Sequence, residues 1–257
     1  MLRTENLSCG YGDHMVLEGV DFSAKPGELI CILGSNGSGK STLIKTIVGL
    51  ERPLGGRIEI EGEDIRGWSF RKRARYLSYI PQTFSANFQY KCMDIVLMGR
   101  TAYLGFASSP SKEDEKIASR AFETLKINHL KDKIYSQLSG GERQLVKIAQ
   151  AITQEARIII MDEPANNLDF GNQITLFNHL VDCKNMGITI IMVTHSPEHA
   201  FLYASKVLLV KEGRVMEIEE PNSNLKEEDL RNIYEVDLNL VELDWKDRMV
   251  KVCIPDY

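Results

Sequence analysis

Three largely apolar runs mark the chain, at Leu29–Leu33, 158–161 and 188–193, and only the last is interrupted, by Thr189. A run without alternating polar positions is typical of a strand that is covered on both faces in a parallel sheet. Each run is followed by glycine or polar residues, and in α/β folds ligand sites lie at the carboxyl ends of such strands. The pattern therefore predicts an α/β fold with its chemistry at strand ends.

Short strands are predicted at residues 2–7, 15–22 and 57–60, with glycine-containing turns at 9–13 and 21–27. The first two predicted strands lie on either side of the turn at 9–13.

Tyr11 stands inside the first predicted turn. The glycines on either side would hold its ring away from the sheet, and a displaced aromatic ring can stack on a nucleotide base. The alternative is an ordinary half-buried strand residue, and the tyrosine alone does not decide between the two.

From residue 83 to 130 the pattern changes to apolar positions three and four residues apart, which indicates helices. We predict a smaller helical unit, about 83–155, inserted into a larger domain that spans 1–222. A loop within it, 103–110, carries two aromatic residues that either pack inward or form a contact surface.

The end of the chain, 223–257, is predicted to form an extension. A helix is expected at 226–234, with Asn224 as its cap and Glu227 at its third position. Alternating residues between 236 and 254 predict a β-hairpin, whose purpose the sequence does not indicate.

The segment between Leu29–Leu33 and a predicted helix at 41–48 fits the pattern G-x-x-x-x-G-K-[ST] of a phosphate-binding loop. Its glycines allow successive N–H groups to face an anion, and the following helix adds the partial positive charge of its N-terminus. Lys40 supplies a point charge for the β- and γ-phosphates, and the Ser41 hydroxyl suits Mg²⁺. The residues predicted to bind the phosphates are Gly34, Ser35, Asn36, Gly37, Ser38, Gly39, Lys40, Ser41 and Thr42.

Ser139 and Glu142 have the S-x-x-E spacing of a capping box, so Ser139 is expected to begin a helix. The first turn of that helix would contain Gly140 and Gly141, each of which destabilises a helix by roughly 1 kcal/mol. Such a pair indicates that something approaches the backbone closely, and a γ-phosphate would fit. A purely structural capping box is the alternative.

Asp162 and Glu163 end the run 158–161, and two acids there need a cation or a shared proton. Asp162 fits an outer ligand of Mg²⁺, and Glu163 fits the residue that orients and deprotonates an attacking water. Gln82 follows a predicted strand that ends at Pro81, where its amide can reach the metal or that water.

His195 follows the run 188–193. Its neighbours have local explanations, since Ser196 can cap a helix and Pro197 suits the first helical position. Nothing local requires a histidine. It is therefore a candidate for sensing the γ-phosphate, on the expectation that it shares a sheet edge with Asp162.

The 257 residues contain 31 Lys and Arg against 36 Asp and Glu, a net charge of −5, which argues against a broad nucleic-acid surface. The five cysteines are scattered without a CxxC motif, which suits a reducing compartment. The charged start predicts no signal peptide, and the apolar runs are too short to span a bilayer. Work at a membrane would need a partner that spans it.

Taken together, these motifs resemble the nucleotide-binding subunit of an ATP-binding cassette (ABC) transporter, and they occur in that family's order. The resemblance implies ATP and Mg²⁺ as ligands, and a P-loop NTPase core with an N-terminal antiparallel β subdomain and an inserted α-helical subdomain. The matching residues are Tyr11 for adenine stacking, Gly34 to Thr42 for Walker A, Gln82 for the Q-loop, Ser139, Gly140, Gly141 and Glu142 for the signature, 158–163 for Walker B, Asn167 to Asp169 for the D-loop and His195 for the switch histidine.

The resemblance also implies a head-to-tail homodimer, in which the signature and Asp169 of one copy close over the ATP of the other. Such subunits sit at the cytoplasmic face of the membrane on transmembrane permease subunits, which usually work with a substrate-binding protein. Two departures, Ala165 in place of a common threonine and Gln150 in place of arginine, concern the fine tuning of dimer contacts.

Within the family, residues 94–100, 103–105 and 111–114 resemble importers of iron chelates, haem and cobalamin, whose relatives include molybdate importers. The sequence does not name the cargo. An alternative is a soluble cassette ATPase that acts on nucleic acid or ribosomes, but those usually carry two cassettes or a coiled-coil insertion. A phosphate-loop kinase would leave Ser139 to Glu142 and His195 without an explanation.

Overall fold

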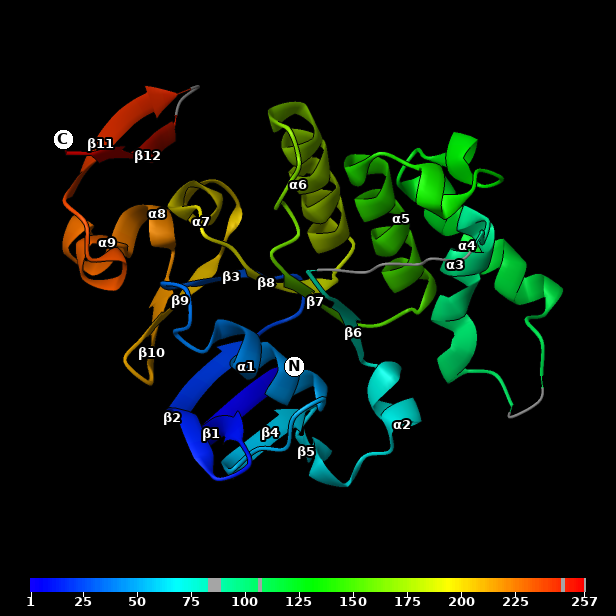
Figure 1. Cartoon of the computed structure of the whole chain (residues 1–257), viewed down its shortest axis with the longest axis horizontal. Helices are drawn as coiled ribbons and strands as arrows, with labels where there is room; N and C mark the ends of the chain where they lie inside the picture. The colour runs from blue at the N-terminus through cyan, green and yellow to red at the C-terminus, as the bar shows by residue number, and fades with distance from the viewer. Residues whose placement is uncertain (83–88, 106–107, 246–247, 257) are drawn as a thin grey trace. The chain divides into compact units, whose positions relative to one another are not determined.

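The computed structural model describes residues 1–82, 89–105, 108–245 and 248–256. The chain forms two compact units: the first consists of Met1–Gly67 with Thr189–Tyr257, and the second is Trp68–Ile188. In Figure 1 the first unit contains the blue start and the orange-to-red end of the chain, and the second runs from cyan to yellow-green. The predicted limits of the inserted helical unit, 83–155, begin outside the described residues and stay a prediction.

An antiparallel sheet in the order β2-β1-β4-β5 begins the first unit, as the family resemblance implies. Its strands are β1 (Leu2–Tyr11), β2 (His14–Ala24), β4 (Gly55–Ile60) and β5 (Glu63–Asp64).

Both predicted turns in this sheet were too long. Tyr11 pairs with His14, so the first turn is only two residues, and β2 continues to Ala24. Gly10, which suggested a turn, is a strand residue where the backbones come close: a Cβ there would lie 2.0 Å from the carbonyl oxygen of His14. A glycine in a strand often marks such an approach.

The apolar runs form buried parallel strands in the first unit, as predicted. β3 (Leu29–Leu33) lies between β8 (Thr189–Val193) and β9 (Lys206–Lys211), parallel to both. Every residue of β3 and β8 is buried. An antiparallel strand, β10 (Arg214–Glu219), pairs with β9.

Helices follow two of these strands directly. α1 (Lys40–Val48) comes after β3, and α7 (Pro197–Tyr203) comes after β8. The polar residues between strand and helix therefore lie at the carboxyl ends of parallel strands, which is where the sequence predicts them.

The second unit holds two parallel strands, β6 (Leu77–Ile80) and β7 (Ile158–Asp162), which pair from Leu77 with Ile158 to Ile80 with Met161. α5 packs against α3 and α4 to form the helical part that the periodicity predicts. The α-helices described in this unit are α2 (Phe70–Ala74), α3 (Cys92–Leu97), α4 (Lys112–Thr124), α5 (Gly140–Thr153) and α6 (Phe170–Asn185).

A buried arginine joins the helices of this part. Arg100 Nε donates to Asp114 Oδ1 at 2.8 Å, and its Nη1 donates to the carbonyl of Thr153 at 3.0 Å. Tyr103 lies against the guanidinium, with 4.0 Å between Arg100 Cζ and the ring centre. Of the two aromatic residues in the loop 103–110, Tyr103 therefore packs inward, and the other, Phe106, lies outside the described residues.

The C-terminal extension contains α8 (Pro221–Asn224), α9 (Glu227–Tyr234) and the predicted hairpin. The hairpin strands are β11 (Leu238–Trp245) and β12 (Arg248–Pro255). No described helix is long and apolar enough to cross a membrane.

The predicted cap of the C-terminal helix is wrong. Asn224 ends α8, and its amide donates to the carbonyl of Glu219 at 2.8 Å. α9 begins after Lys226, whose N–H donates to Asp229 Oδ2 at 2.9 Å. Asp229, rather than Glu227, occupies the third helical position because Lys226 is the N-cap of α9.

Candidate functional site

The phosphate loop, residues 34–42, joins β3 to α1 and is curved by its own lysine. Lys40 Nζ donates to the carbonyls of Gly34 at 2.9 Å and Ser35 at 2.7 Å. Lys40 is only 5% exposed, so these bonds hold an otherwise costly buried charge in the loop. The loop is thereby shaped around the ammonium group.

Two glycines of the loop are required by their surroundings. A Cβ on Gly34 would lie 2.4 Å from the carbonyl oxygen of Val210 in β9. Gly39 has a φ of 107°, and a Cβ there would lie 2.9 Å from both Val16 and Leu17 of β2. Any larger residue at either position would push the loop off the strands that support it.

The loop fits a bound phosphate on independent grounds. The Ser38 hydroxyl is buried and makes no hydrogen bond to the described part of the chain, which is rare for a buried polar atom. The N-cap residue of α1 is Gly39, which has no side chain to cap the first N–H groups of the helix. A phosphate oxygen would satisfy both sets of donors.

The surroundings also suit Mg²⁺ bound to a triphosphate. No group of three or more His, Cys, Asp or Glu among the described residues could enclose a metal ion. Mg²⁺ keeps several waters and is usually held by one or two protein groups together with substrate phosphates. The hydroxyl of Ser41, in the first turn of α1, is of the kind that such an ion uses.

Tyr11 is the last residue of β1, not part of an open turn, yet its side chain is 43% exposed. Its hydroxyl accepts a hydrogen bond from Thr42 Oγ1 at 3.2 Å. The ring is therefore tied to α1 beside the phosphate loop, and its stacking role stays a prediction.

His195 lies between β8 and α7 and is half-buried. Ser196 occupies the N-cap position of α7 as predicted, but its side chain makes no capping bond, and its hydroxyl donates to Glu198 Oε2 at 2.6 Å instead. Pro197 does occupy the first turn of the helix as predicted. The carbonyl of His195 accepts a hydrogen bond from Tyr234 at 3.1 Å, a contact that the sequence does not suggest.

A second histidine of this segment escaped the sequence prediction. His199 Nδ1 lies 2.7 Å from Thr194 Oγ1. Burial lowers the pKa of His199 to about 4, with a small opposing effect from Glu198. The ring is therefore neutral at physiological pH and serves as a hydrogen-bonding partner of the segment that carries His195.

The folded chain should consequently lose stability in mild acid. The unfolded state takes up a proton at His199 near its ordinary pKa of 6.5, whereas the folded state resists until about pH 4. The free energy of unfolding therefore falls as the pH drops from 6.5 to 4, which lowers the midpoint of thermal unfolding by roughly 3 °C or more. His199→Gln, which keeps a hydrogen-bonding side chain, should flatten the dependence of the unfolding midpoint on pH in thermal scans between pH 6.5 and 4.

Burial also lowers the pKa of His179, so part of this pH dependence remains in the His199→Gln chain. A His199→Gln slope identical to that of the unmodified chain would contradict the assignment.

In the second unit, two predicted residues meet directly. Gln82 Nε2 donates to Glu163 Oε2 at 2.6 Å. Asn166, a residue that the sequence prediction missed, donates its amide to the same carboxylate oxygen. Glu163 has a φ of 50°, a strained value that clusters at functional sites, and the buried Asp162 precedes it at the end of β7.

The predicted capping box begins α5. Ser139 Oγ accepts from the N–H of Glu142 at 3.3 Å, and Glu142 Oε2 accepts from the N–H of Ser139 at 2.9 Å. The bond from Ser139, together with Lys133, lowers the pKa of the Glu142 carboxyl.

The close approach at the two signature glycines has an internal explanation in the structure. A Cβ on Gly141 would lie 2.6 Å from Asn172 Cγ of α6, whereas Gly140 has only ordinary contacts. Asn172 is itself held by Asp169, which accepts from its N–H at 2.8 Å and from its side-chain amide at 2.7 Å. Asp169 thus caps α6, and its nucleotide contact stays a prediction. The spacing of Asp169 and Asn172 resembles a cap and could have indicated this pair.

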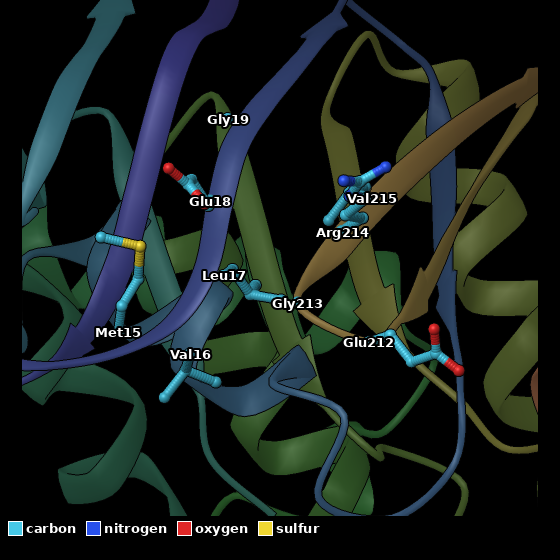
Figure 2. A pocket seen from close by; sticks show the side chains of 9 residues that line it. All are labelled: Met15, Val16, Leu17, Glu18, Gly19, Glu212, Gly213, Arg214 and Val215. Carbon is cyan, nitrogen blue, oxygen red and sulfur yellow. The ribbon is translucent and has the colours of Figure 1, made fainter.

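A pocket of about 650 Å³ in the first unit contains none of the predicted site residues. Figure 2 shows that β2 forms one wall, and that the turn between β9 and β10 together with the first residues of β10 forms the other. Val16 and Leu17 belong both to this wall and to the support under Gly39. The lining residues are Met15, Val16, Leu17, Glu18, Gly19, Glu212, Gly213, Arg214 and Val215.

The comparisons with known proteins give the class of protein. The family model of the ABC transporter matches residues 17–166, which is more than half of the chain. The chain belongs to the ATP-binding proteins of ABC transporters, which are ATPases coupled to transport.

Individual relatives agree over nearly the whole length. An uncharacterized ABC transporter ATP-binding protein of Haemophilus influenzae is 38% identical, over 91% of this chain and 89% of the relative. The molybdate import ATP-binding protein MolC of the same organism is 31% identical, over 100% of this chain and 96% of the relative. Among solved structures, an inward-facing putative metal-chelate type ABC transporter has a chain that matches with a TM-score of 0.88 and 31% identity, covering 100% of this chain and 97% of the other.

Proposed function

We propose that this chain is the ATP-hydrolysing subunit of an importer for a metal-chelate-type substrate: an iron-siderophore complex, haem, cobalamin or molybdate. The hydrogen bond of Gln82 to Glu163 carries the ATPase part of the proposal, because it joins two predicted catalytic residues that are 81 positions apart. The import part is supported by relatives named for molybdate, hemin and ferric enterobactin transport and by the metal-chelate transporter structure.

The first unit would bind the nucleotide. Lys40 and the N–H groups of the phosphate loop hold the phosphates, Ser38 offers its unpaired hydroxyl, and Tyr11 stacks on the adenine. Ser41 would hold Mg²⁺, with Gln82 and Asp162 of the second unit as further ligands. When bound, the ion neutralises charge on the β- and γ-phosphates.

Glu163 would orient the attacking water and accept its proton. Its carboxylate oxygen accepts hydrogen bonds from Gln82 and Asn166, which fix the direction of the carboxylate. His195 would contact the γ-phosphate and stabilise the charge that develops on it.

Two copies would act together. Ser139, Gly140, Gly141, Glu142 and Asp169 of one copy would close over the ATP bound by the phosphate loop of the other. The dimer would lie peripherally at the cytoplasmic face of the membrane, on permease subunits that receive cargo from a substrate-binding protein. The alternative role on nucleic acid or ribosomes gains no support from the relatives, and no nucleic-acid partner is proposed.

Co-expression with the permease tests the proposal. The chain should co-purify with the permease, with one copy of this chain for each permease subunit. Its rate of ATP hydrolysis should rise when the complex is placed in lipid. Co-sedimentation with ribosomes, without any complex with a permease, would contradict the transport role and favour the alternative.

The coupling surface on the helical part gives a further prediction. The sequence predicts that cysteines at Ala86 and Ala102, in the helical part, cross-link to cytoplasmic loops of the permease, but Ala86 lies outside the described residues. Ala102 is wrong as a probe, because only 8% of it is exposed. Thr101, beside it, is exposed and replaces it.

A chain with Thr101→Cys should cross-link to the permease, and bulky substitution there should uncouple transport while basal hydrolysis continues. Cys253 is replaced by alanine in the background, since the other cysteines are buried. Asn185→Cys, at the exposed last residue of α6, is the matched control and should not cross-link. Cross-links that form only from the C-terminal hairpin would show that the surface is misplaced.

A further inference from the structure

Tyr234, the last residue of α9, reaches from the C-terminal extension to the segment that carries His195. Its hydroxyl donates to the carbonyl of His195 at 3.1 Å. Burial, reinforced by nearby Cys253 and Glu198, raises the pKa of Tyr234, so the hydroxyl keeps its proton and remains a donor. A hydroxyl that is partly shielded from water loses stability without a hydrogen-bond partner, so this bond is favoured in the folded state.

The residues on either side of His195 are fixed from within the ATPase fold. The N–H of Thr194 donates to the carbonyl of Ile32 in β3 at 3.1 Å. On the other side, the Ser196 hydroxyl bonds to Glu198. The carbonyl of His195 belongs to the peptide group between His195 and Ser196. The orientation of this group determines the direction in which the His195 side chain leaves the backbone, and Tyr234 holds its carbonyl.

The extension is braced well enough to act as a support. Arg231 Nε donates to the carbonyl of Leu238 at 2.7 Å, and the N–H of Leu240 donates to Glu227 Oε2 at 2.8 Å. These bonds join α9 to the first strand of the hairpin. The hydroxyl of Tyr234 is therefore carried by an anchored helix rather than by a loose end.

The hairpin is in turn held against the rest of the first unit. Lys251 is 9% exposed and donates to the carbonyls of Ser223 at 3.2 Å and Leu225 at 3.0 Å. β12 also packs against α7, the helix that follows His195, where Cys253 interacts with Glu198. Figure 1 shows the helices of the extension grouped with α7.

We propose that Tyr234 is a positioning residue for ATP hydrolysis: through the His195 carbonyl, the C-terminal extension sets the direction of the switch histidine without touching the nucleotide. This inference rests on the role proposed for His195. It assigns a purpose to the extension, which the sequence left unexplained.

Tyr234→Phe in the full-length chain tests the inference, because it removes the hydroxyl and keeps the ring. We expect kcat for ATP to fall about tenfold, as the loss of one buried hydrogen bond at a catalytic segment would allow, with KM unchanged. In a His195→Ala background the same change should have no further effect on kcat. Arg231→Gln removes one brace between α9 and the hairpin but leaves the Tyr234 hydroxyl in place, so it should lower kcat less than Tyr234→Phe does.

Amide hydrogen exchange adds a readout that is independent of activity. Tyr234→Phe should speed exchange at residues 194–196 and leave residues 34–42 unchanged.

Three results would overturn the inference. A normal kcat in Tyr234→Phe, while His195→Ala is impaired, would reject Tyr234 alone and leave the proposed function intact. A normal kcat in His195→Ala would reject the role of His195 itself, and the inference with it. An equal loss in Arg231→Gln and Tyr234→Phe would show a general packing effect.

Discussion

Glu163→Gln should bind Mg-ATP as tightly as the unmodified chain and hydrolyse it at least about 100-fold more slowly, as expected for removal of a positioned general base. A glutamine has the shape of the glutamate, and its carbonyl oxygen can still accept the hydrogen bonds from Gln82 and Asn166. It cannot take a proton from water as a carboxylate does. Binding and folding therefore persist while the proton acceptor is lost.

Single-turnover hydrolysis and equilibrium ATP binding, measured on the same preparation, separate the two effects. Glu212→Gln makes the same chemical change on an exposed turn between β9 and β10 and should have no effect. The bound ATP should also hold two Glu163→Gln chains together, which sedimentation can detect. Hydrolysis near the unmodified rate would show that another group is the base.

The second large effect concerns a mixed dimer of one Lys40→Ala chain and one Ser139→Arg chain. Lys40→Ala removes the positive charge that would bind the phosphates, together with the two hydrogen bonds that curve the loop. Ser139→Arg destroys the capping box and fills the N-terminus of α5 with a long side chain. In a head-to-tail dimer both faults fall in one composite site, and the other site contains neither.

Each mutant alone should therefore lose ATP-dependent dimers, whereas the forced mixed dimer should bind one ATP instead of two. The measurement is ATP bound per covalently linked pair, with a linked pair of unmodified chains as the reference. A mixed dimer without any functional site would mean that the phosphate loop and the signature serve ATP within a single copy.

The sequence predicted those parts of the fold and site that are encoded locally. The buried strands follow from unbroken apolar runs such as Leu29–Leu33, and the capping box follows from the spacing of Ser139 and Glu142. The phosphate loop is similarly local, because lysine, hydroxyl and glycines must stand at fixed distances along the chain.

What the sequence missed depends on contacts between distant or competing groups. Tyr234 and His195 are 39 residues apart, and no pattern in either segment indicates their bond. The space beside Gly141 is filled by Asn172, although a phosphate was an equally good explanation before the position of α6 was known. At Ser196 the side chain had two available partners, and the nearby carboxylate of Glu198 competed with the cap.

The most direct test of the central claim is uptake by proteoliposomes that contain this chain, its permease and its binding protein. Iron chelate, haem, cobalamin and molybdate are offered in turn, with ATP on the side of this chain. We predict that one of them accumulates, that accumulation requires ATP, and that Glu163→Gln abolishes it. A complex that hydrolyses ATP but accumulates none of the four, or uptake that continues with Glu163→Gln, would contradict the account.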